Sequence, residues 1–471
     1  MIGALVFAVA MATVVTVPTA EAAKPVGKVG AKALVAPSAA EVRAIHFRTS
    51  MGFNHDLNLV RGMEHVKGAA FPVMVSGRAL VPADVSTELG VPLTLAELKE
   101  VKFRQTVIKD DGPLVKRLSK KVTGKEPAGV FMDNEHGGVL TVAVTGDDAS
   151  VRKTLAVKVL HSDRLKVVKV SRSMDDLKVV AAGVHRDREL SPVPGAIIYA
   201  LAIDEPRNQV EVDAEGDIAA LQAYFDDRYG TGSTYIVLGK AEAVGAKSMS
   251  STPFHTGIKV VNSPPFRGGQ LIVGRLDSTR YQCTSGFVVW RGTASSKNYF
   301  MLTAGHCGSS FVHDIPWYQA DSVAMGRGYK YDKSGTDAQL INIANGAAQW
   351  NSEITLKLGE YRTITSSQGQ GADMVGQTSC ITGMNYGGAR CGKLLNTSKD
   401  FDDGDVSYVT GREIDAACDF GDSGGPAFYG NEARGTISVK LDRAGTANDT
   451  CIYTHIYDNL AAMGASMATS G

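Results

Sequence analysis

Residues 417–428 read ACDFGDSGGPAF and place Ser423 between acidic residues and a run of glycines. Glycine accepts positive φ and lets the backbone pass close to other groups. This composition therefore predicts a serine that is exposed and aimed by a tight turn. A hydroxyl is a poor nucleophile at neutral pH unless a base takes its proton as it attacks. Ser423 is thus a candidate nucleophile that needs a base supplied from elsewhere in the chain.

The chain offers a base and a carboxylate that would orient it. His306 ends an apolar run in MLTAGHCGSS, and histidine is the usual base because its pKa lies near 7. Asp337 opens the apolar run in SGTDAQLINI, where it would fix the tautomer of the imidazole and stabilise the imidazolium. Three other acids lie near it in the sequence and remain alternatives: Asp314, Asp321 and Asp332.

The histidine and serine segments together resemble the chymotrypsin-like serine proteases. The motifs are TAGHC at 303–307 and GDSGGP at 421–426, in that order. The segments CTSGFVVW and CITGMNYGGARCG bring the sequence closest to the secreted bacterial branch, the streptogrisins and alpha-lytic protease. Members of that branch carry a large N-terminal pro region that assists folding, and the first half of this chain is similar in size and placement.

The resemblance implies a role for each matched residue. Ser423 would be the nucleophile, His306 the general acid and base, and Asp337 the orienting carboxylate. The backbone N–H groups of Gly421 and Ser423 would form the oxyanion hole. Family pairing would join the cysteines as Cys283–Cys307, Cys380–Cys391 and Cys418–Cys451.

The substrate pocket is less well defined by the sequence. By its spacing before Cys418, Ala416 would lie at the pocket floor and favour uncharged side chains, whereas a shift of one residue would place Asp415 there and favour basic ones. Ser438 resembles the start of the strand that pairs with substrate backbone. The family usually has glycine two residues later, where this chain has Lys440, a bulkier residue that would narrow the pocket.

Asp422 should be buried beside the oxyanion loop and therefore needs a cationic partner. Ile272 is a poor candidate for a new N-terminus that would pair with it, because it lies only 11 residues before Cys283. The bacterial branch often has a basic residue just after the first cysteine of its CITG-like segment, but this chain has Ile381 there. Arg390 and Arg412 remain candidates.

The elements that must position these residues divide the chain of 471 residues into several parts. We expect a signal peptide at 1–23, an α+β pro region at 24–245, a serine- and proline-rich linker at 246–265 and a protease domain at 266–471. Within the pro region, Thr94 and Glu97 predict a capping box that opens a helix. Residues 129–147 and 200–217 each predict a strand, a turn and a second strand, and suggest two related subdomains. Residues 218–230 predict an amphipathic helix that ends at Gly230.

From residue 268 onward, short β-type runs alternate with turn residues. This pattern predicts a sandwich or barrel. The family resemblance narrows the expectation to a mainly β, chymotrypsin-like double barrel after an α+β pro region.

Composition and cysteine placement indicate the compartment and partners. Lysine plus arginine number 49, as do aspartate plus glutamate, so the chain offers no charge excess for a nucleic-acid or membrane-surface partner. Six cysteines, all after residue 282, together with an apolar leader that ends in a small-x-small pattern, predict a secreted, disulfide-bonded protein. No metal or organic cofactor is implied, and we expect a monomer.

The leading hypothesis is a secreted serine endopeptidase, made as a pre-pro-protein, that acts on protein or peptide substrates. Its pro region would serve as both folding aid and inhibitor, and the mature enzyme would begin near residues 262–272. One alternative is a weak or inactive protease-fold protein that binds peptides or cell-wall material. Another is that residues 24–245 remain attached as a permanent binding module.

Overall fold

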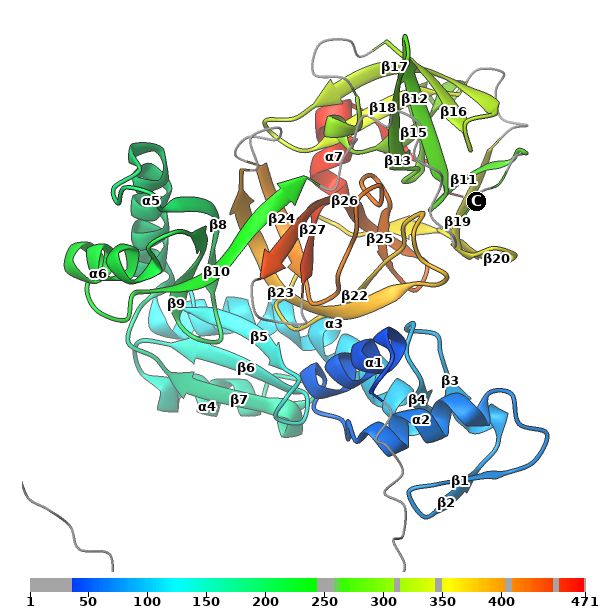
Figure 1. Cartoon of the computed structure of the whole chain (residues 1–471). Coiled ribbons are helices and arrows are strands. Elements are labelled where there is room, and N and C mark those ends of the chain that lie inside the picture. Colours follow the sequence, from blue (N-terminus) through cyan, green and yellow to red (C-terminus); the bar gives the residue numbers. More distant parts are fainter. Residues whose placement is uncertain are drawn as a thin grey trace, which may run out of the picture. The chain divides into compact units, whose positions relative to one another are not determined.

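The computed structural model describes residues 36–243, 259, 261, 263–308, 314–343, 350–402, 409–443 and 449–469 (Figure 1). The expected signal peptide and most of the expected linker lie outside these ranges. The chain separates into two units, Met1–Pro37 and Ser38–Gly471, and every element described below belongs to the second.

The second unit opens with small elements that pack around a long helix. They are α1 (Ala39–Ser50), α2 (Leu57–Val66), β1 (Val73–Val75), β2 (Arg78–Leu80), β3 (Val85–Ser86) and β4 (Leu93–Thr94). The long helix is α3 (Leu95–Thr123), and the predicted capping box is confirmed because Thr94 accepts from the N–H of Glu97 while Glu97 accepts from the N–H of Thr94. Helix α3 ends at Gly124, which caps it in the left-handed conformation with a φ of 71°.

Two copies of one αββαβ order follow, which confirms the two related subdomains. The first runs from α3 through β5 (Gly129–Asp133), β6 (Val139–Val144), α4 (Asp148–Ala156) and β7 (Leu165–Lys169). The second runs through α5 (Met174–Leu190), β8 (Ile197–Asp204), β9 (Gln209–Glu215), α6 (Ile218–Tyr229) and β10 (Thr234–Ala243). In each copy the first two strands are antiparallel and the last strand is parallel to the second. The helix predicted before Gly230 is α6, and Gly230 caps it.

A curved sheet of eight strands follows the linker, in the order β13-β12-β16-β17-β18-β15-β14-β28. Its strands are β12 (Leu271–Leu276), β13 (Thr279–Thr284), β14 (Val288–Thr293), β15 (Ser296–Thr303), β16 (Pro316–Gln319), β17 (Val323–Asp332), β18 (Ala338–Asn342) and β28 (Ser466–Met467). A small sheet of β11 (Phe266–Gly268), β19 (Trp350–Lys357) and β20 (Glu360–Thr363) accompanies it. Fully buried Ile272, Met301 and Trp317 lie in the core of this half.

The last strands form a closed barrel. They are β21 (Ser366–Ser367), β22 (Thr378–Ile381), β23 (Arg390–Phe401), β24 (Val409–Ile414), β25 (Pro426–Tyr429), β26 (Glu432–Arg443) and β27 (Thr450–His455). The order β23-β22-β25-β26-β27-β24 closes because β23 also pairs with β24. Helix α7 (Ile456–Met463) follows β27 and contacts both this barrel and β17 and β18 of the preceding sheet. The mainly β, chymotrypsin-like architecture after an α+β region is therefore confirmed.

The N-terminal region joins the closed barrel through its strands. β8 pairs with β23, so that Leu201 lies opposite Asp400, and β10 pairs with β26 from Gly239–Arg443 to Ala243–Val439. β8, β9 and β10 thereby belong to the same sheet as the barrel strands (Figure 1). Within the ranges that the structure describes, no helix is long and apolar enough to cross a bilayer.

Candidate active site

Ser423, His306 and Asp337 lie on three turns that the strands bring together. His306 lies in a short 3-10 helix, η3 (Gly305–Cys307), directly after β15, and Asp337 directly precedes β18. β15 and β18 are antiparallel neighbours with Thr303 opposite Gln339, so the ends that carry the two residues meet. Ser423 lies in the turn before β25 and arrives from the closed barrel.

The three side chains form a continuous hydrogen-bonded chain. His306 Nε2 lies 2.8 Å from Ser423 Oγ, and His306 Nδ1 lies 2.6 Å from Asp337 Oδ2. The backbone N–H of His306 also donates to Asp337 Oδ1 over 2.8 Å, so both carboxylate oxygens contact His306. None of the three side chains is more than 2% exposed, so the prediction of an exposed Ser423 is wrong for this structure. The surrounding residues shield these bonds from competing water.

Asp337 remains ionised although it is fully buried. Burial alone would raise its pKa, but the neighbouring His306 and the hydrogen bonds it receives hold that pKa below the ordinary value. One of those bonds comes from Ser438 Oγ, which donates to Asp337 Oδ2 over 2.6 Å. Ser438 lies on β26, as the strand pattern predicted, but the contact of its hydroxyl with Asp337 is a feature that sequence reasoning missed.

The three alternative acids lie in other contacts. Asp314 pairs with Arg327, and Asp321 pairs with Arg275. Asp332 accepts from the backbone N–H of Ser334 in its own turn. Asp337 is the acid that contacts His306.

The turn around Ser423 carries the backbone N–H groups of Gly421 and Ser423, the two donors expected from the sequence. Gly421 has a φ of 92° and Gly424 a φ of 80°, conformations that favour glycine. A Cβ on Gly424 would lie 1.9 Å from Thr303 Oγ1, so this position also needs glycine for space. Among the described residues, no acceptor contacts the N–H of Gly421 or of Ser423. Both donors are therefore free to bind an incoming oxygen.

Asp422 is buried next to these donors and is held by neutral groups. Its Oδ1 accepts from the backbone N–H of Asn385 over 3.1 Å and from Asn385 Nδ2 over 3.0 Å. Its Oδ2 accepts from the N–H of Asp419 over 2.9 Å. Burial nevertheless raises the pKa of Asp422 to about 6.

The cations considered from the sequence do not pair with Asp422. Arg412 pairs with Asp373 and Asp458 instead. Arg390 stacks on the Tyr386 ring, 3.4 Å from its centroid, and donates to the carbonyl of Ala417. Ile272 lies in the middle of β12, opposite Cys283, and is fully buried there.

The pocket residues lie in two places. Ala416 and Asp415 line a cavity of about 520 Å³ whose wall also includes His46 of α1. The Asp415 carboxylate lies 2.6 Å from His46 Nε2. Lys440 lies on β26 and pairs with Asp449 over 2.8 Å. Neither Ser438 nor Lys440 is among the described residues that line this cavity.

The three disulfides join the expected cysteines. Cys283–Cys307, Cys380–Cys391 and Cys418–Cys451 are bonded, with S–S distances of 2.02, 1.96 and 2.13 Å. The first ties β13 to the His306 turn, and the last ties the Ser423 turn to β27. The catalytic candidates are thus cross-linked to the barrels that carry them.

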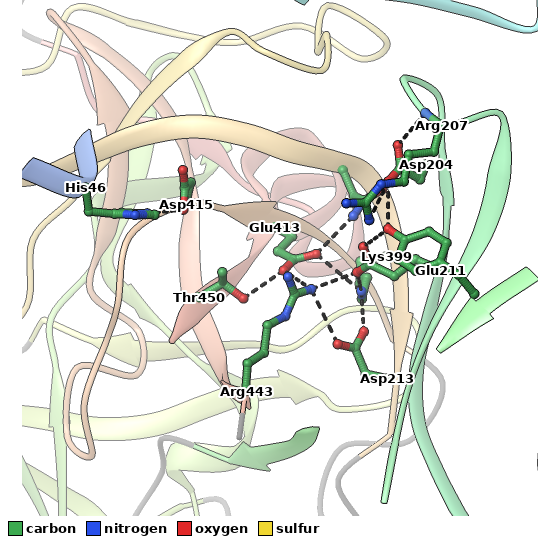
Figure 2. Close-up of polar contacts among 12 residues, drawn as sticks. His46, Asp204, Arg207, Glu211, Asp213, Lys399, Glu413, Asp415, Arg443 and Thr450 are labelled. Carbon is green, nitrogen blue, oxygen red and sulfur yellow. Dashed lines mark hydrogen bonds and ion pairs between the residues drawn. The ribbon is translucent and has the colours of Figure 1, made fainter. Parts of the chain in front are cut away.

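A buried group of charges joins the N-terminal region to the closed barrel. This interface charge cluster consists of Glu211, Asp213, Lys399, Glu413 and Arg443, which face one another in Figure 2. Lys399 contacts Glu211 and Asp213 of β9 and lies 3.3 Å from Glu413 of β24. Arg443 lies 2.7 Å from both Glu211 and Glu413. No local pattern in the sequence marks these residues, because their proximity depends on the pairing of β8 with β23.

The fold and this arrangement of side chains define a two-barrel domain with a serine–histidine–aspartate site. The trypsin family model matches residues 277–462, so these residues form a chymotrypsin-like serine protease domain of the trypsin family. The resemblance inferred from the motifs is thereby confirmed for this part of the chain.

Solved structures of bacterial proteases are similar to the same part of the chain. Thermobifida fusca protease A is 24% identical over a match that covers 43% of this chain and 98% of that protease, with a TM-score of 0.36. Cellulomonas bogoriensis chymotrypsin is 20% identical, covers 43% of this chain and 98% of its own, and has a TM-score of 0.35. The alpha-lytic protease homologue N4 is 25% identical, covers 42% of this chain and 97% of its own, and has a TM-score of 0.34. No curated protein matches the chain significantly.

Proposed function

We propose that the chain is the precursor of a serine endopeptidase that cleaves peptide bonds through an acyl-enzyme on Ser423. The observation that carries the proposal is the pair of contacts on His306, 2.8 Å to Ser423 Oγ and 2.6 Å to Asp337 Oδ2, in front of two uncommitted N–H groups. A base within hydrogen-bond reach of a nucleophile, and itself oriented by a third group, is the arrangement that acyl transfer needs.

In the acylation step, Ser423 Oγ attacks the carbonyl carbon of the scissile bond while His306 Nε2 takes its proton. The carbonyl oxygen becomes an oxyanion, which the N–H groups of Gly421 and Ser423 would stabilise. One such donor typically contributes about 10²–10³ in kcat. The imidazolium, stabilised by Asp337, then protonates the leaving amine, and the peptide C–N bond breaks.

Deacylation repeats these proton transfers with water as the nucleophile. His306 takes a proton from water as the water oxygen attacks the acyl carbon, and the proton returns to Ser423 Oγ as the ester bond breaks. Every proton and electron pair in the cycle is handled by Ser423, His306, water and the substrate, so the proposed reaction uses no cofactor.

We propose that the N-terminal region inhibits the protease domain until it is removed, and assists its folding. Its strand β10 pairs with β26, and the register places Glu242 opposite Lys440 and Ala243 opposite Val439. An extended substrate would add to this same strand edge next to Ser438.

We propose further that the chain is exported and acts as a monomer. The three disulfides support export, because such bonds persist in oxidising compartments. The apolar leader at 1–23 supports it independently. For the specificity pocket we retain Ala416 as the floor and an uncharged preference. Because Asp415 pairs with His46 only while the N-terminal region is attached, a preference for basic side chains through Asp415 is the alternative.

The test is to express the wild-type chain and the Ser423→Ala variant, and to analyse both by mass spectrometry and with a peptide library. The proposal predicts that the wild-type chain is cut between its two regions and hydrolyses peptides, and that Ser423→Ala does neither. A wild-type protein with all three disulfides formed but no hydrolysis would favour a binding protein with a protease fold. Hydrolysis by a chain that keeps residues 24–245 would favour a permanent binding module.

A further inference from the structure

Lys259 is a buried lysine that lies outside the active site described above. It precedes β11 and is 1% exposed. Its ammonium donates to the carbonyl of Thr355 over 3.0 Å and to Thr382 Oγ1 over 2.5 Å. A lysine is almost never fully buried unless its charge is compensated, and both of these acceptors are neutral. Burial therefore disfavours the charged form of this amine, and its two hydrogen bonds hold it in place.

The backbone of Lys259 is joined to the protease domain as firmly as its side chain. Its N–H donates to the carbonyl of Met384 over 2.9 Å, and its carbonyl accepts from the N–H of Leu271 over 3.3 Å. Lys259 thus bridges the start of β12 and the loop that follows β22. Because every partner of Lys259 in these bonds lies in the protease domain, the bridge does not depend on the N-terminal region.

The loop that Lys259 contacts is the same loop that holds Asp422. Thr382 and Met384 contact Lys259, and Asn385 donates its backbone N–H and its Nδ2 to Asp422 Oδ1. Gly383 lies between them, and a Cβ there would lie 2.1 Å from Asp422 Oδ1, which shows how closely the loop approaches the carboxylate.

The negative charge of Asp422 acts through space on the buried amine of Lys259. Burial lowers the pKa of Lys259 to about 7, and the negative charge of Asp422 opposes that fall. Arg412 pairs elsewhere, and Arg390 contacts Tyr386 and Ala417 rather than the carboxylate. The charge of Arg390 lowers the pKa of Asp422 from a distance, whereas Lys259 acts on the loop that holds Asp422 through its direct contacts with Thr382 and Met384.

We propose that Lys259 is the buried anchor of the loop that holds Asp422, and that it thereby orders the Asp422–Ser423 turn and the N–H groups of Gly421 and Ser423. The released protease must then retain Lys259, so the cleavage that releases it lies before Lys259. This inference rests on the proposed protease function. It places the new N-terminus upstream of the range 262–272 expected from the sequence. Lys259 is a positioning residue, because it acts on the turn rather than on the substrate.

The first test is N-terminal sequencing of the processed wild-type protein. The proposal predicts a first residue at or before Lys259. A first residue beyond 259 would overturn it, since the enzyme would then work without this lysine. Because this readout needs only one cleavage event, it is separate from the peptide-hydrolysis assay that tests the proposed function.

The second test compares Lys259→Met with a matched control, Lys357→Met. Methionine keeps most of the packing volume and removes the charge, whereas Lys357 is a surface lysine with a side chain 59% exposed. With active sites counted by burst titration, Lys259→Met should lower kcat by about tenfold or more and change KM by less than about threefold. The loss in kcat should not exceed about 10²–10³-fold, the effect of removing one oxyanion donor. Lys357→Met should match wild type.

Two results would overturn the proposal in this assay. One is a Lys259→Met protein with wild-type kcat. The other is a loss confined to KM, because disorder of the oxyanion turn acts on the transition state rather than on binding.

If Lys259→Met does not fold, amine acylation of the full-length Ser423→Ala chain replaces it. The Lys259 amine should be protected at least about tenfold relative to Lys357, since burial excludes the reagent. Equal labelling of the two amines would refute the buried position on which the proposal depends.

Discussion

Replacing Lys399 with methionine should weaken the contact between the N-terminal region and the closed barrel more than any surface substitution there. Lys399 is fully buried, and its ammonium contacts Glu211 and Asp213 of β9 and lies 3.3 Å from Glu413 (Figure 2). After the substitution, Arg443 is the one cation among the described residues that still pairs with the three buried carboxylates. Removal of one partner from a buried ion pair costs about 3–5 kcal/mol.

This cost can be read from amide hydrogen exchange in a Ser423→Ala chain, which stays uncut. The N–H of Asp402 donates to the carbonyl of Tyr199 over 3.0 Å, so it is released when β8 separates from β23. A loss of about 3–5 kcal/mol corresponds to protection lower by roughly 10²- to 10⁴-fold at this amide. Amides in the core of the preceding sheet should keep their protection.

Lys393→Met is the matched control, since Lys393 also joins the two regions. It lies 2.6 Å from Glu135, but the Glu135 side chain is 55% exposed. An exposed pair contributes about 0–1 kcal/mol, so protection should fall less than about fivefold. The reasoning is refuted if Lys399→Met lowers protection no more than Lys393→Met does.

Three further predictions concern the site and its pH dependence. Ser438→Ala should lower kcat about tenfold, because Asp337 loses a hydrogen bond of 2.6 Å. Such a bond to a charged group is worth about 1.5–3 kcal/mol. Steady-state kinetics of the processed protein measure the loss in kcat. Asp337→Asn should lower kcat by about 10⁴-fold, because an amide favours the wrong tautomer of His306. The same kinetic assay measures this, and a loss in kcat below about tenfold would contradict the role assigned to Asp337. The two regions should associate more tightly at pH 5.5 than at pH 8, as hydrogen exchange on the uncut chain would report; equal protection at both values would contradict this. Burial raises the pKa of Asp213 to about 6, so ionisation of Asp213 destabilises the interface above that pH. The hydrogen bond to Asp415 raises the pKa of His46, so the stability that protonated His46 contributes is lost as the pH rises through this raised pKa.

The catalytic candidates could be predicted from the sequence because short motifs carry them. TAGHC and GDSGGP each place one reactive residue on a turn whose glycines have a local physical reason, as at Gly424. The apolar strand that follows Asp337 distinguishes it from the other three acids, and the structure places Asp337 next to His306. The repeated strand–turn–strand pattern of the N-terminal region was likewise local, and it was visible for the same reason.

The contacts that link distant segments could not be predicted in this way. Lys399 lies in a strand with ordinary alternation, and nothing nearby indicates that Glu211 lies against it. Lys259 lies in a stretch that reads as linker by composition, yet its side chain is buried beside the loop that holds Asp422. Both depend on which strands become neighbours, and a single sequence does not encode that in any short pattern.

The most direct test of the central claim is the reaction of the processed protein with an aryl phosphonate, followed by peptide mapping. The account predicts one adduct per molecule, on Ser423 Oγ, with labelling at least about 10³-fold slower in His306→Ala because the hydroxyl then lacks its base. An unlabelled wild-type protein, an adduct on another residue, or equal rates in wild type and His306→Ala would contradict it.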